Sequence, residues 1–393
     1  MSTPVTVASR LSGYLRGGGI ITPLLTALVA FIAGGLVVAL TGSNPFTTYK
    51  AIFDGSGLNW LFPWISSEDR TTAALNLQQT LILTTPLILV GMAVAYAFRA
   101  GLFNIGGQGQ YLVGSFAGVW AGSSLDGLPA APHVAVAIGM GTLAGAIWGG
   151  IAGLLKATTG ANEVITTIML NYVALWIGVY AFGLGGPLHS STQESVPISN
   201  EVLEGARLSV FWGDPELQGL HVGFFVALVM LGLFWVLLNR SVTGYEARAV
   251  GFNPDAAESG GIHAGRTYAR VMLLCGSFAG LAGALDVLGW QFTVATNDIQ
   301  NSQIGFIGIA VALLGRNTAG GIFFSALLFG ALINGTSVRN LDPAIFEPEL
   351  ATNLTTIVQG LIVLLVSAPV IVTSIYSLRR RLRPGAREQE AET

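Results

Sequence analysis

The chain has 393 residues, of which 52% are apolar and only 10% are charged, whereas soluble globular domains carry about 25% charged residues. This composition excludes an ordinary soluble domain. The net charge of −3 says little about partners, and the sequence offers no general basic face for nucleic acid. Glycine fills 52 positions, and small residues let helices pack closely in lipid. The composition therefore predicts an all-α, polytopic membrane protein with tightly packed helices and membrane lipid around them.

Ten apolar segments are candidates for transmembrane helices, because about 20 helical residues cross a bilayer. In chain order they lie at about 20–41, 75–98, 102–121, 132–155, 163–184, 220–238, 270–289, 303–315, 318–335 and 353–376. They predict a transmembrane domain over 20–376, preceded by a cytoplasmic segment at 1–19. A cytoplasmic tail at 377–393 is basic at first and then has the composition of a disordered segment.

Positive charges predict the orientation of the chain, because Lys and Arg are retained in cytoplasmic loops. Ten spans with a cytoplasmic N-terminus place 14 of the 18 Lys and Arg residues inside and 4 outside. The run LRRRLRPGAR after the last span adds weight to this arrangement. Both termini are therefore expected in the cytoplasm, with two long outer loops at about 42–74 and 185–219.

Three amide side chains stand out within the third apolar segment. The stretch RAGLFNIGGQGQYLVGSFAG at 99–118 places Asn104, Gln108 and Gln110 beside Gly101, Gly106, Gly107 and Gly109, so we expect irregular backbone there. Such backbone is tolerated at bilayer depth only when it is buried in protein or lines a wet cavity. Amides both donate and accept hydrogen bonds, which suits hydroxyls and heterocycles. We interpret the stretch as part of a substrate path, with hydrogen bonding between helices as the alternative.

A second short element follows Gln303, at 303–315, and its apolar length is closer to half a span than to a full one. If spans two to five and seven to ten are two repeats, the irregular third span and this eighth span occupy corresponding positions. The repeats would have inverted topologies, and matched broken segments of this kind indicate a transport site. We therefore add Gln303 to the predicted substrate path.

The segment TGANEVITTIMLNY at 159–172 begins the fifth span with polar residues. Thr159 or Asn162 is suited to cap the helix, and Glu163 in the first turn complements the positive end of the helix dipole. Thr167 and Asn171 are four residues apart and share one face. Asn162, Glu163, Thr167 and Asn171 are therefore predicted to belong to the substrate path, with a purely structural role for Glu163 as the alternative.

Two further features concern packing and buried charge. Gly141, Gly145, Gly149 and Gly153 recur at every fourth residue of the fourth span, which predicts a face of close helix contact. Asp286 lies inside the seventh span, and intramembrane acids are candidates for function. Its alternative role is a local hydrogen bond near the outer end of the helix.

The inner loop at 239–269 contains signals for a short helix of about six residues. Asn253 is a good N-cap, Pro254 fits the first helical position, and Gly260 with Gly261 can end the element. With Ala256 and Ala257 expected to face outward, this helix would offer a small, flat surface to another protein.

Four sequence blocks, GLFNIGGQGQ, GANEVITTIMLNY, GYEARAVGFNPDAAESGGI and GFIGIAVALLGRN, resemble the permease subunits of nucleoside-type ABC importers, within the ribose and branched-chain amino acid permease group. The resemblance covers about 75–376. It implies a type II importer fold in a bacterial cytoplasmic membrane and nucleoside substrates, with simple sugars as the alternative. It also implies a second permease, a cytoplasmic ATPase that holds ATP and Mg, and a lipid-anchored outer binding protein.

The same resemblance implies that the inner loop docks into the ATPase. The residues that carry this implied coupling role are Glu246, Ala249, Gly251, Asn253, Ala256, Ala257, Gly261 and Ile262.

Other functional classes fit the sequence less well. A P-loop needs Lys followed by Ser or Thr, but Lys50 and Lys156 are each followed by Ala, so we expect no ATPase activity and no cofactor in this chain. An ion-driven transporter would favour several buried carboxylates or histidines, and only Glu163 and Asp286 qualify. The four histidines have no metal-ligand spacing, so neither a metal site nor a catalytic residue is predicted.

Overall fold

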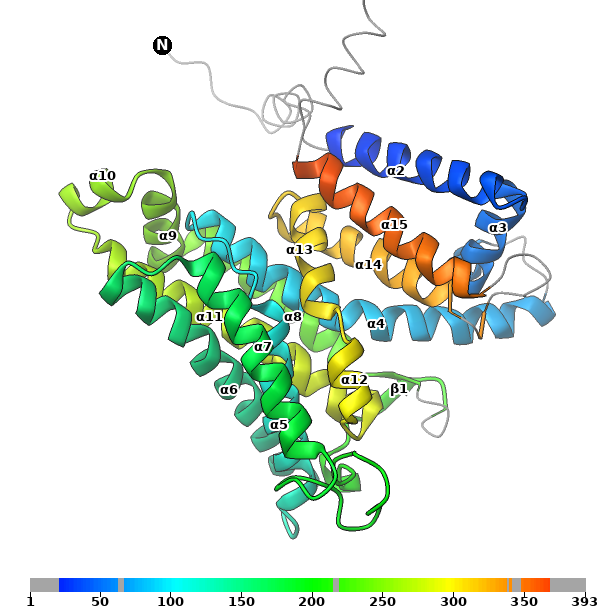
Figure 1. Cartoon of the computed structure of the whole chain (residues 1–393), viewed down its shortest axis with the longest axis horizontal. Coiled ribbons are helices and arrows are strands. Elements are labelled where there is room, and N and C mark those ends of the chain that lie inside the picture. Colours follow the sequence, from blue (N-terminus) through cyan, green and yellow to red (C-terminus); the bar gives the residue numbers. More distant parts are fainter. Residues whose placement is uncertain (1–20, 63–66, 215–218, 338, 341–347, 368–393) are drawn as a thin grey trace, which may run out of the picture. The chain divides into compact units, whose positions relative to one another are not determined.

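The computed structural model describes residues 21–62, 67–214, 219–337, 339–340 and 348–367 (Figure 1). The predicted segments at 1–19 and 377–393, including the basic run, lie outside the described residues. The chain forms two compact units, one from Met1–Lys50 with Asp342–Thr393 and the other from Ala51–Leu341.

The described part of the first unit contains α2 (Ile21–Leu40), α15 (Pro348–Ser367) and the beginning of α3 (Pro45–Gly55). Helices α2 and α15 pack against each other. Gly34 allows this contact, since a Cβ atom there would lie 2.7 Å from Cγ2 of Val358. The Tyr49 hydroxyl donates a hydrogen bond of 2.6 Å to the carbonyl of Phe31, which fastens α3 to α2.

The second unit contains most of the helices. They are α4 (Ser67–Arg99), α5 (Gly107–Ser124), α6 (Ala130–Thr159), α7 (Glu163–Phe182), α8 (Gly223–Arg240), α9 (Val242–Phe252), α10 (Pro254–Ser259), α11 (Ala264–Asp286), α12 (Thr296–Asn301), α13 (Ile304–Leu314) and α14 (Ala319–Gly335). Short 3-10 turns, η1 (Leu58–Leu61) and η2 (Glu204–Ala206), lie in the two long loops before α4 and after α7. Two strands, β1 (Val210–Trp212) and β2 (Leu220–His221), pair antiparallel.

Helices α4 and α11 form the core of the second unit. In their most apolar windows 83% of the residues are buried, compared with 22% to 28% in α6, α7 and α8. A helix that is apolar on all sides is stable when neighbours surround it. Accordingly, α11 contacts α4, α5 and α6, while α4 also contacts α8, α13 and α14.

Six helices among the described residues, α2, α4, α6, α7, α8 and α11, have the length and hydropathy of a membrane span. The prediction of a polytopic helical membrane protein is therefore confirmed. The other four predicted segments coincide with α5, α13, α14 and α15. The total of ten spans stays a prediction.

Several boundaries differ from the predicted ones. Helix α5 begins only at Gly107. The helical path ends after α4, where Gly101 has a left-handed conformation (φ 71°). Irregular backbone was expected throughout 99–118, but the part from Gly107 onward, with Gln108 and Gln110, lies in the regular helix α5. The sixth span begins at Gly223 rather than 220, because β2 takes up the preceding residues. The inner loop holds two helices, α9 and α10, rather than one.

Candidate functional site

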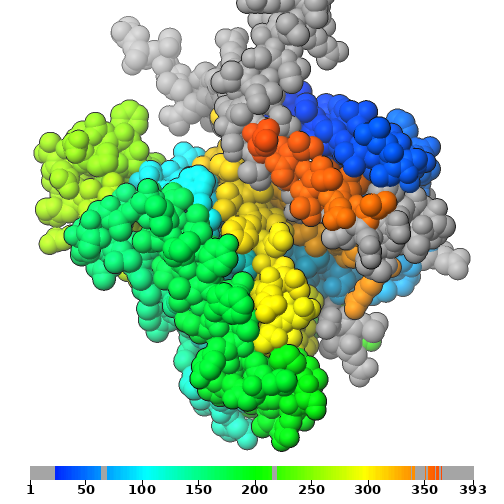
Figure 2. All heavy atoms as spheres, in the orientation of Figure 1, coloured from blue at the N-terminus to red at the C-terminus, as the bar shows by residue number. Residues whose placement is uncertain are grey.

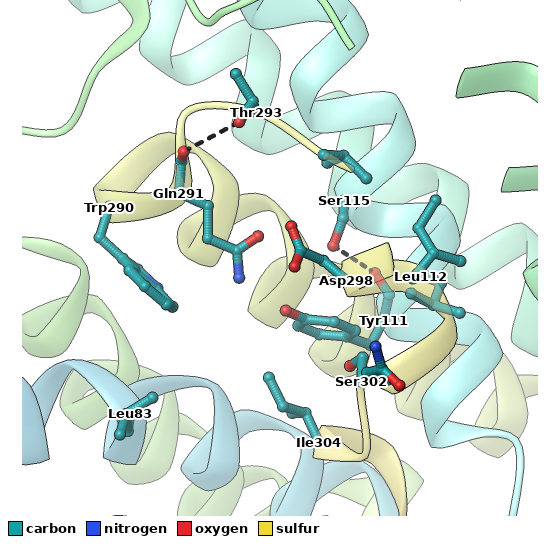
Figure 3. A pocket seen from close by; sticks show the side chains of 13 residues that line it. Leu83, Tyr111, Leu112, Ser115, Trp290, Gln291, Thr293, Asp298, Ser302 and Ile304 are labelled. Atoms are coloured by element: carbon teal, nitrogen blue, oxygen red, sulfur yellow. Dashed lines mark hydrogen bonds between the residues drawn. The ribbon is translucent and has the colours of Figure 1, made fainter. Parts of the chain in front are cut away.

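A cavity of about 450 Å³ lies in the second unit beside α12, and we refer to it as the α12 cavity (Figure 3). Its volume falls within the range of about 300–1,000 Å³ that is usual for small-molecule sites. The lining residues come from α4, α5, the segment after α11, α12 and α13. They are Leu83, Tyr111, Leu112, Ser115, Trp290, Gln291, Thr293, Val294, Asp298, Ile299, Asn301, Ser302 and Ile304.

A π-helical turn, η4 (Val287–Gln291), extends α11 and brings Trp290 and Gln291 to the cavity. π-helical turns are rare and frequent at functional sites. The turn ends at Phe292, which has a left-handed backbone (φ 58°) and whose amide donates to the Val287 carbonyl at 2.9 Å. Since this conformation is uncommon for a non-glycine residue, surrounding contacts must hold it. The Arg207 guanidinium lies 4.5 Å from the centre of the Phe292 ring and supplies one such contact.

Backbone hydrogen bonds from the outer loop also hold the π-helical turn. The amide of Val202 donates to the carbonyl of Phe292 at 2.8 Å, and the amide of Leu208 donates to the carbonyl of Leu288 at 2.9 Å. These backbone hydrogen bonds join the loop segment 199–208 to the segment that contains η4. They fix the position of the turn, and with it the two side chains that η4 contributes to the cavity.

Asp286 lies directly behind the cavity and is 2% exposed. Its carboxylate accepts hydrogen bonds from the Tyr111 hydroxyl at 2.5 Å, from Gln291 Nε2 at 3.2 Å and from the Trp290 indole N–H. All three donors belong to residues that line the cavity. Asp286, a candidate for function on sequence grounds, therefore organises one wall of the cavity without lining it.

The side of the cavity formed by α12 is polar. Asp298 and Asn301 on α12 are exposed, and Ser302 follows at the end of the helix. The Ser302 hydroxyl is buried and has no hydrogen-bond partner within the part of the chain that the structure describes. Aromatic rings offer faces for stacking, while carboxylate, amide and hydroxyl groups bind hydroxyls. The cavity thus combines the two kinds of contact that a small ligand with a flat ring and hydroxyl groups requires.

The predicted amide cluster forms hydrogen bonds within the protein. Asn104 and Gln110 exchange two bonds, of 3.1 and 3.2 Å, and Asn104 Oδ1 also accepts from the amide of Gly106 at 3.0 Å. Asn104 and Gln110 are both buried. The amide of Gly106, in the irregular backbone before α5, thereby has a partner. The hydrogen bonds of these side chains join the irregular segment to α5, and their contact with a solute stays a prediction.

Asn171 fastens the same irregular segment to α7. Its Oδ1 accepts from the amide of Gly109 at 2.8 Å, and its Nδ2 donates to the carbonyl of Ile105 at 2.9 Å. As predicted from their spacing, Thr167 and Asn171 face the interior, with exposures of 1% and 5%. The polar stripe on α7 is therefore a seam against α5.

Asn171→Ala is expected to lower the thermal unfolding midpoint of the purified protein. The buried amide of Gly109 and the half-buried carbonyl of Ile105 would lose their partners, at a cost of about 1–3 kcal/mol for a buried group left unsatisfied. Met169→Ala, on the exposed side of the same helix, is the control and should change the midpoint little. Equal stability of the two variants would contradict this role for Asn171.

The N-terminal ends of α5 and α13, the two short elements, meet. Gln108 Oε1 accepts a hydrogen bond of 2.7 Å from the amide of Gly305, and Gly305 is needed there because a Cβ atom would overlap the backbone of Gln108. Gln108 Nε2 is buried without a partner among the described residues, whereas the Gln303 side chain is exposed. The inverted repeats, in which the third and eighth spans occupy corresponding positions, stay a prediction.

The remaining predicted path residues lie at the start of α7. Asn162 caps the helix by accepting from the amides of Val164 and Ile165, as expected. Glu163 forms an ion pair of 2.7 Å with Lys156. None of the eight predicted path residues, all of which the structure describes, lines the α12 cavity. Their contact with a solute stays a prediction.

The implied coupling segment forms a small structured unit. Asn253 caps α10 through a hydrogen bond of 3.1 Å from the amide of Ala256 to its Oδ1, and Pro254 occupies the first turn, both as predicted. Glu246 on α9 pairs with Arg270 on α11 at 3.1 Å. Figure 2 shows α9 and α10 projecting from the other helices of the unit.

One prediction about this segment was wrong. Ala257 was expected to face outward, but it is 6% exposed and packs with Val250 and Ala264. A six-residue helix that folds back on its neighbours must bury one face, and Ala257 lies on it. Ala256 is exposed, so only one of the two alanines offers a surface to a partner. Gly251, Gly261 and the exposed Asn253 remain at positions consistent with the implied role, and Ala249 and Ile262 pack against the same small core.

Sequence reasoning missed the residues of the α12 cavity. The polar run TNDIQNSQ at 296–303 was a usable signal, because it follows an aromatic residue and an apolar span, but only Gln303 was selected from it. Trp290 and Tyr111 gave no separate signal, since single aromatic residues are common at membrane boundaries.

Comparison with known proteins was made for the whole chain. A family model described as branched-chain amino acid transport system, permease component, matches residues 76–367. The guanosine ABC transporter permease NupP of Bacillus subtilis is 37% identical over 80% of this chain and 84% of its own. The nucleoside ABC transporter permease NupB of Lactococcus lactis is 32% identical over 86% and 88%, and the glucose ABC transporter permease TsgB13 of Haloferax volcanii is 31% identical over 92% and 89%. No solved structure matches significantly. The chain therefore belongs to the branched-chain amino acid transport system permease family, whose members are the membrane subunits of ABC transporters.

Proposed function

We propose that this chain is the permease subunit of an ABC importer for nucleosides. The observation that carries the substrate class is the α12 cavity, which places Trp290 and Tyr111 against the polar side chains of α12. A nucleoside has a flat base that stacks on aromatic rings and a ribose whose hydroxyls bind carboxylate and amide groups. The similarity to the guanosine and nucleoside permeases supports the same substrate class.

The remaining parts of the transporter follow from this proposal. A second, related permease would complete the membrane path, and a cytoplasmic subunit would bind ATP and Mg and dock at α9 and α10. An extracytoplasmic binding lipoprotein would deliver the solute to the outer loops. The chain would cross the bacterial cytoplasmic membrane ten times with both termini inside, so that the α12 cavity opens towards the outer side.

The test is substrate uptake by the complete transporter in right-side-out membrane vesicles or in proteoliposomes. Radiolabelled guanosine, adenosine, uridine, ribose and glucose are each supplied with ATP on the cytoplasmic side. Saturable uptake of nucleosides that an excess of glucose leaves unchanged is the expected result. Glucose is the second candidate because of the similarity to the Haloferax permease. Uptake of glucose or ribose without nucleosides would refute the nucleoside assignment and leave the family membership intact.

A further inference from the structure

Asp286 and the α12 cavity together carry an inference about how the substrate is recognised within the membrane subunit. It rests on the proposed nucleoside function. We propose that the cavity is a nucleoside subsite with two parts. An aromatic clamp, Trp290 and Tyr111, binds the base, and a polar edge, Asp298, Asn301 and Ser302, binds the ribose hydroxyls. Asp286 is a positioning residue that holds the clamp.

The hydrogen bonds of the clamp determine what it can offer to a ligand. The Trp290 N–H and the Tyr111 hydroxyl both donate to the Asp286 carboxylate. Their polar atoms are therefore occupied behind the cavity wall, and the ring faces remain for the ligand. A ring face binds another flat ring by stacking, which favours a nucleobase as the group that occupies this side.

Gln291 adds a polar contact next to the clamp. Its Nε2 donates to Asp286 at 3.2 Å, which sets the orientation of the amide. The Oε1 atom of the same amide is then left as an acceptor. The edge of a nucleobase carries N–H donors, so a fixed acceptor beside a stacking surface can bind the edge of a base while its ring stacks.

The polar edge lies on α12 and directly after it. Asp298 and Asn301 are three residues apart and therefore share one face of the helix. Asn301 Nδ2 donates to Asn297 Oδ1 at 2.9 Å, which leaves Asn301 Oδ1 as an acceptor. Two acceptors and the hydroxyl of Ser302, buried without a partner among the described residues, match the vicinal hydroxyls of ribose.

A simpler role for Asp286 would be to fasten the end of α11 to α5. The two roles differ in what they predict for ligands. A fastening role affects the stability of the protein and treats all ligands alike. A positioning role changes the binding of the base and leaves the contribution of the ribose hydroxyls unchanged.

The test is equilibrium binding of tritiated guanosine and of 2′,3′-dideoxyguanosine to the purified permease and ATPase complex in nanodiscs, without the binding protein. Trp290→Ala and Asp286→Asn are each expected to weaken binding of both ligands about tenfold or more. Trp290→Phe, which keeps a ring face, should recover most of the affinity. The double variant Asp298→Ala with Asn301→Ala should weaken guanosine about tenfold and leave the dideoxynucleoside unchanged. Gln300→Ala, an exposed position of α12 that does not line the cavity, is the control.

Each outcome decides the proposal. The subsite would be overturned if the wild-type complex bound no guanosine, or if the clamp variants bound it as tightly as the wild type. The proposed function would still stand in either case if the complete transporter takes up nucleosides. Equal losses for both ligands in the polar-edge variant would refute the division into two parts. An Asp286→Asn protein that loses thermal stability but binds guanosine normally would assign Asp286 to fastening alone. If that variant does not fold, the comparison of Trp290→Ala with Trp290→Phe decides the clamp by itself.

Discussion

Gly145→Val is expected to prevent the second unit from folding, whereas Gly139→Val on the same helix should be tolerated. A Cβ atom at Gly145 would lie 2.5 Å from both the Gly276 carbonyl oxygen and the Gly280 Cα atom. Both are backbone atoms, which cannot move aside as a flexible side chain can. A Cβ atom at Gly139 meets nothing within 4 Å, so the two positions form a matched pair.

The size of the effect follows from the role of α11. Overpacking a close contact costs about 1–3 kcal/mol when neighbours can adjust, and more when whole helices must separate. Here α6 would be pushed from α11, the helix that also contacts α4 and α5. Total stabilities of about 5–15 kcal/mol leave little reserve against such a loss.

The measurement is the yield of monodisperse protein after detergent extraction, together with its thermal unfolding midpoint. The valine variant at position 145 should give aggregated or degraded protein, and the variant at 139 should resemble the wild type. Similar yields and midpoints for the two would show that α6 and α11 are not in backbone contact along this seam.

Much of this architecture was accessible from the sequence because it depends on local signals. The glycine seam on α6 was predicted from its four-residue spacing, and all four glycines are buried. The Asn253 cap and the Pro254 start of α10 were predicted because capping is decided within a few residues. Long apolar segments predicted the helices because the thickness of the bilayer sets the length of a span.

The features that depend on distant residues were not predictable. Tyr111 and Asp286 are 175 positions apart, yet their hydrogen bond defines one wall of the cavity. Hydropathy contains no information on such a pairing. The orientation of Ala257 was mispredicted for a related reason. Its partners are Val250 on α9 and Ala264 on α11, and the fold of the loop, rather than its sequence spacing, brings them together.

One helix connects the segment implied in coupling with the proposed nucleoside subsite. Helix α11 begins at Ala264, which packs against α10, and ends at Asp286, which holds the aromatic clamp. Near its start Arg270 pairs with Glu246 on α9.

The exposed surface of α10 provides a test of ATPase docking at this segment. Ala256→Arg is expected to abolish uptake and to release the ATPase from the purified complex, while the permease itself stays folded. Ala256 is exposed, so a longer side chain does not disturb the permease, but it would overlap an ATPase surface docked against this helix. Overlap of that kind costs about 1–3 kcal/mol, which weakens docking roughly 5 to 150-fold, and an unpaired charge buried at the contact adds several kcal/mol.

Two further variants separate docking from folding. Ala257→Arg places the same charge in the small core with Val250 and Ala264, so it should lower the thermal stability of the permease as well as uptake. Ala131→Arg, at an exposed position near the start of α6, should change neither, because exposed substitutions usually stay within about 0.5 kcal/mol. The readouts are ATPase co-purification, uptake in vesicles with equal amounts of permease, and the unfolding midpoint. Normal ATPase association and uptake for Ala256→Arg would remove the exposed face of α10 from the docking surface and place the contact elsewhere on the cytoplasmic side.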